Sequence, residues 1–355
     1  MSKETTADTD RTSPSEPRPL SPPQRIVEWL ATRNMFATMG GFGVVGLVAA
    51  RLGAPAPLVI LVFLAGGVFP LVLAMVSTRE DGYDQTVSIW MQMKFLVSQL
   101  AWAVTPWGLL TQALQLGGTA AAYLRHGGQL PSRNRQVPTT VLTAPFDGEW
   151  TTVNGGVTKP TSHSWGIVSQ RYAYDFLITD DHGETYEGDG NRLTDYYAFG
   201  EPIRAPADGT AVETNGGFRD YPRPGSGWLE WRTWNIAGNH VVIKHADGEY
   251  STLAHLKEGS IQVAPGDEVE RGEVIGECGN SGLSSEPHLH FQLQDYRNFW
   301  FAAGLVPRFE GVTIDRSDER RASHEVYEAC EGVAEGRYLW AGDRITSACE
   351  VQTEG

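Results

Sequence analysis

The stretch GNSGLSSEPHLHFQLQD, residues 279–295, contains the most informative pattern in the chain. Gly279 and Gly282 enclose an Asn-Ser pair and predict a tight turn that leads into a strand. Residues two apart on a strand point to the same face, so His288 and His290 are expected to project together. Such a pair can present one imidazole to a metal ion and keep another beside it. Two surface histidines would have the same spacing, but the turn before the strand favours a built site.

The sequence around this stretch is typical of an antiparallel β protein. Beyond residue 140, short apolar or β-branched runs alternate with Gly, Pro, Asn and Asp, as in Gly209–Thr214, His240–His245 and Glu249–Leu253. No long helical period occurs there. We therefore predict a mainly β domain, an antiparallel sandwich or barrel-like sheet, over residues 137–312. An acidic C-terminal extension, residues 313–355, follows it.

The N-terminal part has a different composition. Residues 1–34 are rich in Ser, Thr, Pro and acidic residues, which predicts a disordered tail and not a secretory signal peptide. Residues 35–78 are nearly uncharged, and the run Leu58–Val76 has the roughly 20 apolar residues that cross a bilayer as a helix. We predict a transmembrane helical hairpin there. The alternative, a buried hairpin of a soluble domain, is disfavoured because apolar residues surround the helix.

Residues 79–136 are predicted to hold a third hydrophobic or interfacial helix and a linker. The segment Phe95–Leu114 is uncharged but contains Gln, Ser and Thr, with Trp102 and Trp107 around a proline. It can span the membrane, or lie in the interface with its tryptophans at the level of the lipid headgroups. Arginines near the start favour a cytoplasmic N-terminus. Three spans would then place the C-terminal domain outside the cytoplasm, as we expect, and two would leave it inside.

The charge balance excludes one class of partner. The chain has 28 Lys and Arg against 43 Asp and Glu, a net charge of −15, and an acidic surface repels the phosphate backbone of nucleic acids. The scarcity of lysine favours a halophile over the other source of this bias, a GC-rich genome. Cys278 is expected to be a small buried residue. Cys330 and Cys349 can pair outside the cytoplasm, and no Cys-x-x-Cys pair offers a zinc site.

Five blocks between Ala144 and Phe309 resemble, in order, the lysostaphin-type (LytM-like) zinc metallopeptidases. They are HSWGIVSQRYAYDF (His163–Phe176), FGEPIRAPADGTAV (Phe199–Val212), EYSTLAHL (Glu249–Leu256), PGDEVERGEVIG (Pro265–Gly276) and the stretch 279–295. The resemblance implies an antiparallel LytM-like β domain of the duplicated-hybrid-motif type. It also implies a bound zinc ion and murein endopeptidase-like hydrolysis of peptide bonds.

One position departs from the common pattern of this family. The residue four before the family's aspartate is usually the first histidine ligand, and here it is Arg171. The chain instead resembles the branch with a QRYAYDF run, whose first histidine lies further upstream. The resemblance thus implies His163, Asp175 and His290 as zinc ligands, a set that leaves the fourth position open for water.

His255 and His288 complete the site that the resemblance implies. They would lie beside the metal, one as a general base and the other stabilising the oxyanion, with the two roles not assigned. The prediction is a membrane-anchored zinc metalloendopeptidase, with a peptide or protein as substrate and the lipid bilayer as its other partner. A catalytically inactive LytM-like module that recruits or activates another envelope enzyme is the alternative. A biotinyl- or lipoyl-type carrier barrel is disfavoured because Lys244 and Lys257 do not occupy the expected turn.

The remaining aromatic and histidine residues are expected to be structural or solvated. His126 and His182 lie in sequence typical of a linker and a polar turn, and His240 and His245 have the odd spacing that places side chains on opposite faces. Tryptophans 228, 231 and 234 are more typical of packing than of a substrate platform. Tyr172 and Tyr174 are compatible with either a cleft or the core.

Overall fold

The structure is a computed structural model and describes residues 45–46, 48–55, 58, 89–159, 161–162, 164–315 and 337–347. The chain divides into two compact units, Met1–Asp84 and Gln85–Gly355, and the sheet and both long helices belong to the second. The predicted tail, residues 1–34, and most of the predicted hairpin, residues 35–78, lie outside the described residues. The same is true of His163, Cys330 and Cys349.

Among the described residues from Ile89 onward, two helices precede the sheet, α4 (Ile89–Ala103) and α5 (Pro106–Arg125). Thr105 separates them: its side-chain oxygen accepts a hydrogen bond from the backbone N–H of Gly108 at 3.0 Å, and Pro106 opens α5, where a missing N–H costs nothing. The predicted segment Phe95–Leu114 is therefore divided between two helices. Among the described helices, none is both long and apolar enough to cross a membrane. The interfacial alternative stays a prediction.

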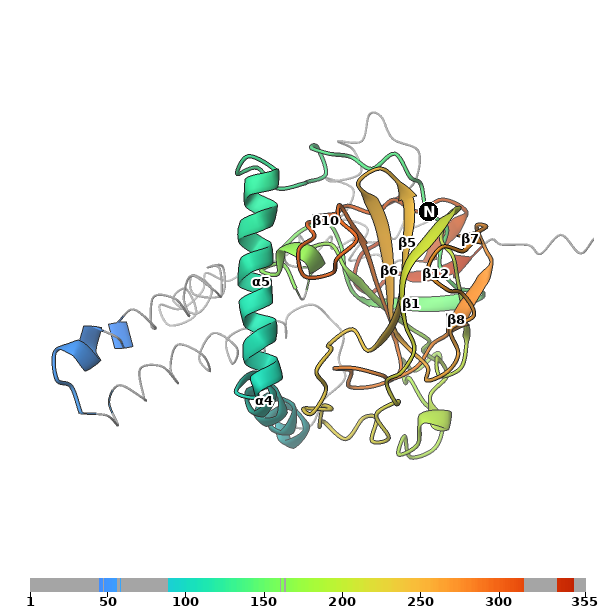
Figure 1. Ribbon diagram of the computed structural model, residues 1–355. Helices are drawn as coiled ribbons and strands as arrows, with labels where there is room; N and C mark the ends of the chain where they lie inside the picture. Colours follow the sequence, from blue (N-terminus) through green and yellow to red (C-terminus); the bar gives the residue numbers. More distant parts are fainter. Residues whose placement is uncertain are drawn as a thin grey trace, which may run out of the picture. The chain divides into compact units, whose positions relative to one another are not determined.

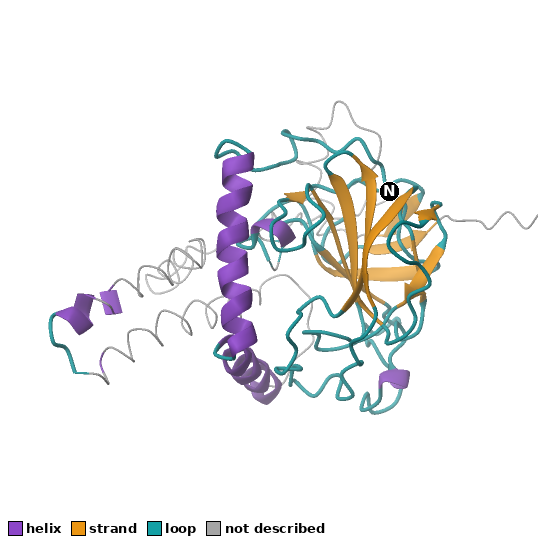
Figure 2. Ribbon diagram, viewed as in Figure 1, coloured by secondary structure: helices purple, strands orange, loops and turns teal. Residues whose placement is uncertain are grey.

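The strands that follow pair antiparallel in two sheets joined by long loops (Figure 2). Ten strands form one sheet in the order β11–β12–β1–β2–β9–β6–β5–β4–β7, with β10 paired to β9, and β3 and β8 form a second, two-stranded sheet. The prediction of a mainly β antiparallel domain is confirmed. In chain order the strands are β1 (Glu149–Asn154), β2 (Tyr174–Leu177), β3 (Pro202–Arg204), β4 (Gly209–Asn215), β5 (Asn239–Ala246), β6 (Glu249–Leu256), β7 (Glu268–Val269), β8 (Val274–Glu277), β9 (Leu289–Gln294), β10 (Gly304–Leu305), β11 (Val312–Asp315) and β12 (Arg344–Ser347), with 3-10 turns η2 (Val168–Gln170) and η3 (Leu193–Asp195).

An aromatic core covers one face of the sheet. On β2, Tyr174 and Phe176 are fully buried, and their rings stack 5.6 Å apart. Phe309 packs edge-on against Tyr174 at 5.7 Å, and the Tyr174 hydroxyl donates to the backbone oxygen of Leu339 at 3.0 Å. Tyr174 therefore belongs to the core. Because neighbouring residues of a strand face opposite sides, Asp175 is turned to the other face of the sheet.

Residues of the predicted C-terminal extension take part in the same sheet. β12 pairs with β1 on one side and with β11 on the other, and Ile345 is fully buried. Strands of the predicted β domain and of the predicted C-terminal extension, which were divided at residue 312, therefore share one core. Cys278 is buried, as predicted, and burial raises the pKa of its thiol.

The C-terminal end of α5 is fixed to the sheet domain, beside which the helix runs (Figure 1). Arg125 donates two hydrogen bonds to the carboxylate of Asp295, at 2.9 and 3.0 Å, and the Nε2 of His126 lies 2.6 Å from the same carboxylate. Gly118 allows close packing, because a Cβ there would lie 1.8 Å from the backbone oxygen of Trp300. The expectation of a solvated His126 is wrong: its side chain is buried against Asp295, which directly follows β9.

Candidate metal centre

The candidate site lies where β2 and β9 run side by side. Asp175 and His290 are direct cross-strand partners, and the Nδ1 of His290 lies 2.9 Å from the Oδ1 of Asp175. Both side chains are buried. From the other neighbouring strand, β1, the side-chain amide of Asn154 donates to the Oδ2 of Asp175 at 3.0 Å. No sequence motif points to Asn154, since only the strand order places it opposite the carboxylate.

A chain of amide side chains orients the His290 ring. Gln292 and Gln294 follow it at two-residue spacing on β9, and both are fully buried. The Gln294 amide donates to two backbone carbonyls of the next loop, at 2.8 and 3.2 Å, so its Oε1 is left to accept from the Gln292 amide. The Oε1 of Gln292 then accepts from the Nε2–H of His290, at 3.1 Å. In neutral His290 the Nδ1 therefore carries a lone pair directed at Asp175.

A nitrogen lone pair and a carboxylate that face each other at 2.9 Å require a cation between them. The pKa of His290 agrees: burial lowers it, but the hydrogen bond to Asp175 and the charge of that carboxylate outweigh burial, so the pKa is raised. A proton can fill this role, and so can zinc, which binds imidazole and carboxylate at about 2.0–2.2 Å. Two tetrahedral zinc ligands are then roughly 3.3 Å apart. The pair fits a zinc site after a shift of a few tenths of an ångström.

His288 faces the same carboxylate. Its Nδ1 lies 2.8 Å from the backbone oxygen of Glu286, and because a carbonyl oxygen can only accept, this nitrogen carries the hydrogen. The Nε2 is left with a lone pair and lies 3.8 Å from the Oδ1 of Asp175. His288 and His290 thus lie on one side of the sheet, and Asp175 lies between their reactive nitrogens.

His255 reaches this face through a β-bulge. In the pairing of β5 with β6, two residues of β6 stand where β5 has one, and His255 is the extra residue, with φ at 62°. Its neighbour Ala254 pairs with His290, so a regular strand would turn His255 to the opposite face. The bulge instead brings its ring centre to 4.7 Å from that of His288 and 5.8 Å from that of His290.

Local contacts hold the His255 ring in one orientation. Its backbone N–H donates to the carbonyl of Ala237 at 3.0 Å, and its Nδ1 donates to the carbonyl of Ser281 at 2.8 Å. Burial lowers the pKa of His255 well below its ordinary value, and the charges of His288 and His290 lower it further. His255 is therefore neutral and presents an Nε2 lone pair to the site.

The structure brings together four of the five predicted site residues: Asp175, His255, His288 and His290. The fifth, His163, lies outside the described residues. The hydroxyls of its neighbours Ser162 and Ser164 donate to backbone oxygens just before β2, at 2.8 and 2.6 Å, so both neighbours are tied to the segment that enters β2. Within the described ranges, no three His, Cys, Asp or Glu side chains are arranged as a complete metal site.

Comparison with known proteins agrees with this geometry. Residues 191–300 match the model of peptidase family M23. The chain contains an M23 peptidase domain. Over 95 residues it is 35% identical to the peptidoglycan DD-endopeptidase ShyA of Vibrio cholerae. The aligned region is 27% of this chain and 18% of that protein. Over 94 residues it is 34% identical to the glycyl-glycine endopeptidase ALE-1 of Staphylococcus capitis. This aligned region is 26% of this chain and 21% of the relative. The chain thus spans about a fifth of the length of each relative.

Solved structures of M23 proteins also align with the chain. The catalytic domain of lysostaphin from Staphylococcus simulans has 21% identity and a TM-score of 0.26, over 44% of this chain and 86% of that one. The M23 metalloprotease pseudoalterin has 16% identity and a TM-score of 0.30, over 51% and 84%. The M23 match includes His255, His288 and His290, whereas Asp175 and His163 precede its first residue.

Proposed function

We propose that this chain is a zinc metalloendopeptidase in which His163, Asp175 and His290 hold the metal. The observation that carries the proposal is the 2.9 Å approach of the Asp175 Oδ1 to the His290 Nδ1, which is close to the spacing of two zinc ligands. When bound, zinc would polarise a carbonyl and lower the pKa of a water molecule. The chain itself supplies the orientation of the ligands and the transfer of protons.

His255 and His288 are the proposed proton-transfer groups. Each donates its Nδ1–H to a backbone carbonyl, so each presents an Nε2 lone pair to the site. A lone pair can take a proton but cannot stabilise an oxyanion, so a ring becomes a hydrogen-bond donor to the oxyanion only after it has been protonated. This chemistry supports one base and one oxyanion donor, with the two roles not divided between the rings.

The proposed substrate is a peptide of the cell envelope, and the crosslinks of peptidoglycan are the first to test. The matched relatives are named as a peptidoglycan DD-endopeptidase and a glycyl-glycine endopeptidase, both of which act on peptide bonds. The alternative is an inactive M23-like module that recruits or activates another envelope enzyme. The two differ in a measurable way, because a recruiting module needs neither a metal nor the proton-transfer histidines.

The test combines metal content with cleavage of purified peptidoglycan, on the full chain and on single variants. We expect about one zinc per chain, its loss in His163→Ala and His290→Ala, and its retention in the exposed control His182→Ala. Circular dichroism checks that each variant is folded. Zinc retained in His163→Ala would exclude that residue as a ligand. A folded parent that takes up no supplied zinc would contradict the peptidase and support the recruiting module.

We also propose that α4 and α5 lie on the membrane, outside the cytoplasm. The exposed apolar side chains of the two helices and of their connection support this placement; the most exposed are Trp90 (74%), Leu116 (72%) and Leu124 (83%) in the helices and Val104 (74%) between them. A neighbouring loop adds to this surface: Leu229 donates its backbone N–H to the Ser98 hydroxyl, and Trp102 donates to the carbonyl of Thr233. The loop carries the partly exposed tryptophans 228 and 231, a residue type that favours the headgroup level.

A spin label on the full chain in lipid vesicles tests the membrane contact. A label at Leu116→Cys is expected to be shielded from a water-soluble relaxation agent and accessible to oxygen. The control label at Lys244→Cys, on β5, is expected to be accessible to the water-soluble agent. Equal accessibility at both positions would contradict the placement. Protease added to intact spheroplasts tests the side, since a domain outside the cytoplasm is expected to be cleaved.

A further inference from the structure

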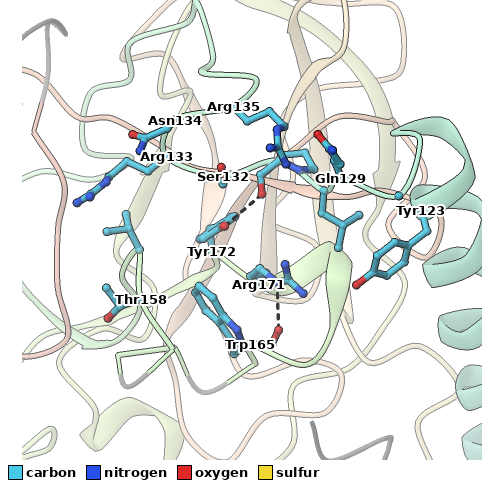
Figure 3. Close-up of a pocket in the computed structure, with 14 residues that line it drawn as sticks. Tyr123, Gln129, Ser132, Arg133, Asn134, Arg135, Thr158, Trp165, Arg171 and Tyr172 are labelled. Carbon is cyan, nitrogen blue, oxygen red and sulfur yellow. Dashed lines mark hydrogen bonds between the residues drawn. The ribbon is translucent and has the colours of Figure 1, made fainter. Parts of the chain in front are cut away.

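A cavity of about 580 Å³ lies against the segment that leads into β2 (Figure 3). That segment forms one wall with Trp165, Arg171 and Tyr172, and the stretch 128–135, between α5 and the sheet, forms another. Arg133 and Arg135 line the cavity from this second wall. None of the 14 lining residues is acidic. The described lining therefore carries three arginines and no carboxylate, in a chain whose net charge is −15.

The guanidinium of Arg171 is held in place beside Trp165 and Tyr172. Its Cζ lies 5.3 Å from the centre of the Trp165 ring, and its Nε donates to the backbone oxygen of Trp165 at 3.2 Å. The two terminal nitrogens form the planar fork that matches a carboxylate. Within the described residues, neither Arg171 nor the exposed Arg135 forms an ion pair with a carboxylate of the chain.

The two walls are joined by direct contacts, so the cavity is formed before a ligand arrives. The Tyr172 hydroxyl donates to the backbone oxygen of Pro131 at 3.2 Å, which connects the β2 side to the other wall. The Trp165 and Tyr172 rings meet edge to face at 5.6 Å. A cavity of this kind, with aromatic walls and a cation held in place, suits a carboxylate attached to an apolar chain.

The cavity shares a chain segment with the candidate metal centre. Arg171 precedes Asp175 by four residues, and its backbone oxygen accepts a hydrogen bond from Ser162, the neighbour of His163. A ligand held by Arg171 would thus lie against the segment that carries the proposed metal ligands.

We propose that this cavity binds a carboxylate of the peptide substrate, so that the enzyme selects peptides with an acidic group to one side of the cleaved bond. The inference rests on the proposed peptidase function and names a specificity site for it. Arg171 and Arg135 are the recognition residues, and Trp165 positions Arg171. The exchange of the family's usual histidine for Arg171 gives this chain a cation that the common pattern lacks.

Binding to the full chain tests the proposal by titration calorimetry with two probes, acetyl-Gly-Gly-Glu-Gly-Gly amide and the same peptide with glutamine. We expect the glutamate peptide to bind about tenfold more tightly. Arg135→Gln and Arg171→Gln are each expected to remove most of this preference, and Arg171→Lys to keep part of it. The matched control is Arg232→Gln, because Arg232 also lies over a tryptophan ring, at 5.1 Å from Trp231, but outside the cavity.

These results test peptide binding in the cavity independently of the proposed catalytic activity. The preference should persist in His290→Ala, which loses the proposed metal, so a failure of catalysis does not imply a failure of binding. Equal affinities of the two probes would overturn the proposal, as would a glutamate preference that survives Arg135→Gln; Arg135 is exposed, so this variant is expected to fold. Inorganic phosphate that binds more tightly than the glutamate peptide would assign the cavity to a free anion and overturn the peptide assignment.

Discussion

The Nδ1 of His290 and the Oδ1 of Asp175 lie 2.9 Å apart across the β2–β9 pair, and Gln292 orients the His290 ring from behind. The orientation begins at backbone carbonyls beyond β9, which determine how Gln294 and then Gln292 present their amides. A buried polar chain of this kind is stable only when every member has a partner. Its continuity makes Gln292 a positioning residue for the proposed metal ligand.

Replacing Gln292 with leucine is expected to weaken zinc binding about 10–100-fold. The substitution keeps the approximate size of the side chain and leaves both proposed ligands of this strand pair in place. It removes the acceptor for the Nε2–H of His290, so the ring loses its fixed orientation. The measurement is competition with a chromophoric zinc chelator on the full chain.

Gln292→Glu is the matched control for this prediction. A carboxylate still accepts the His290 N–H, so zinc affinity is expected to stay within about threefold of the parent. The introduced carboxylate also places an oxygen against the Oε1 of Gln294, with no hydrogen to bridge the two acceptors. The free energy of unfolding should therefore fall by about 1–3 kcal/mol. A Gln292→Leu variant with the parent's zinc affinity would show that packing alone orients the ring.

Two substitutions of His255 are expected to separate the effect of backbone strain on stability from the loss of catalytic function. The left-handed backbone at φ 62° costs most L residues about 1–2 kcal/mol, with asparagine the most tolerant and β-branched residues the least. We expect His255→Asn to fold but to be inactive, and His255→Val to be about 1–2 kcal/mol less stable than His255→Asn. Urea denaturation and a cleavage assay measure the two effects. Equal stabilities of the two variants would contradict a left-handed bulge.

The alternation of the His-x-His strand could be predicted from the sequence, and so could the mainly β fold. The orientation of His255 could not, because it depends on a bulge that moves the ring across the sheet against the strand period. EYSTLAHL itself contains no glycine, the residue that marks a bulge with a left-handed backbone. Asn154 escaped prediction for a related reason: its contact with Asp175 follows from the strand order, which no local pattern encodes.

The cavity beside β2 could not be predicted from the sequence, because its second wall is formed by a stretch whose composition is typical of a linker. Polar residues with glycine and proline, as in 126–137, predict a loop but not what the loop covers. Here Pro131 accepts a hydrogen bond from Tyr172, and Arg133 and Arg135 of the same stretch line the cavity together with Arg171 (Figure 3). Tertiary contacts between residues 41 positions apart decide the function of such a loop.

The stability of the sheet domain is expected to fall below about pH 6.5 partly because of His245. Burial lowers the pKa of this imidazole from its ordinary 6.5. Its Nδ1 donates to the backbone oxygen of Asp208 at 2.8 Å, and its Nε2 lies 2.8 Å from the Ser251 hydroxyl. The unfolded chain therefore takes up a proton at a higher pH than the folded chain does. The stabilisation is complete above the unfolded pKa and decreases as the pH falls through 6.5 toward the folded pKa.

Replacing His245 with glutamine should flatten this dependence, because an amide donates and accepts but does not titrate in this range. The measurement is the free energy of unfolding of parent and variant between about pH 5 and 8. The difference between the two curves isolates His245 from the other titrating groups. Parallel curves would contradict a lowered pKa for His245.

Gly282 is expected to tolerate no side chain, and crowding is a larger cause than its backbone angle. Its φ is +80°, and a Cβ there would lie 2.5 Å from two backbone atoms of the segment that precedes β5. This close contact holds the turn that carries Ser281, whose carbonyl accepts a hydrogen bond from the His255 ring.

Gly183 is the matched control: its φ is +83°, but nothing lies within 4 Å of an added Cβ. Gly183→Ala should therefore lose only about 1–2 kcal/mol of stability. Gly282→Ala should lose about 1–3 kcal/mol more and reduce cleavage by displacing Ser281. Urea denaturation and the cleavage assay compare the two. Equal losses, with cleavage unchanged, would mean that the turn yields to the added methyl group and that His255 keeps its position without this contact.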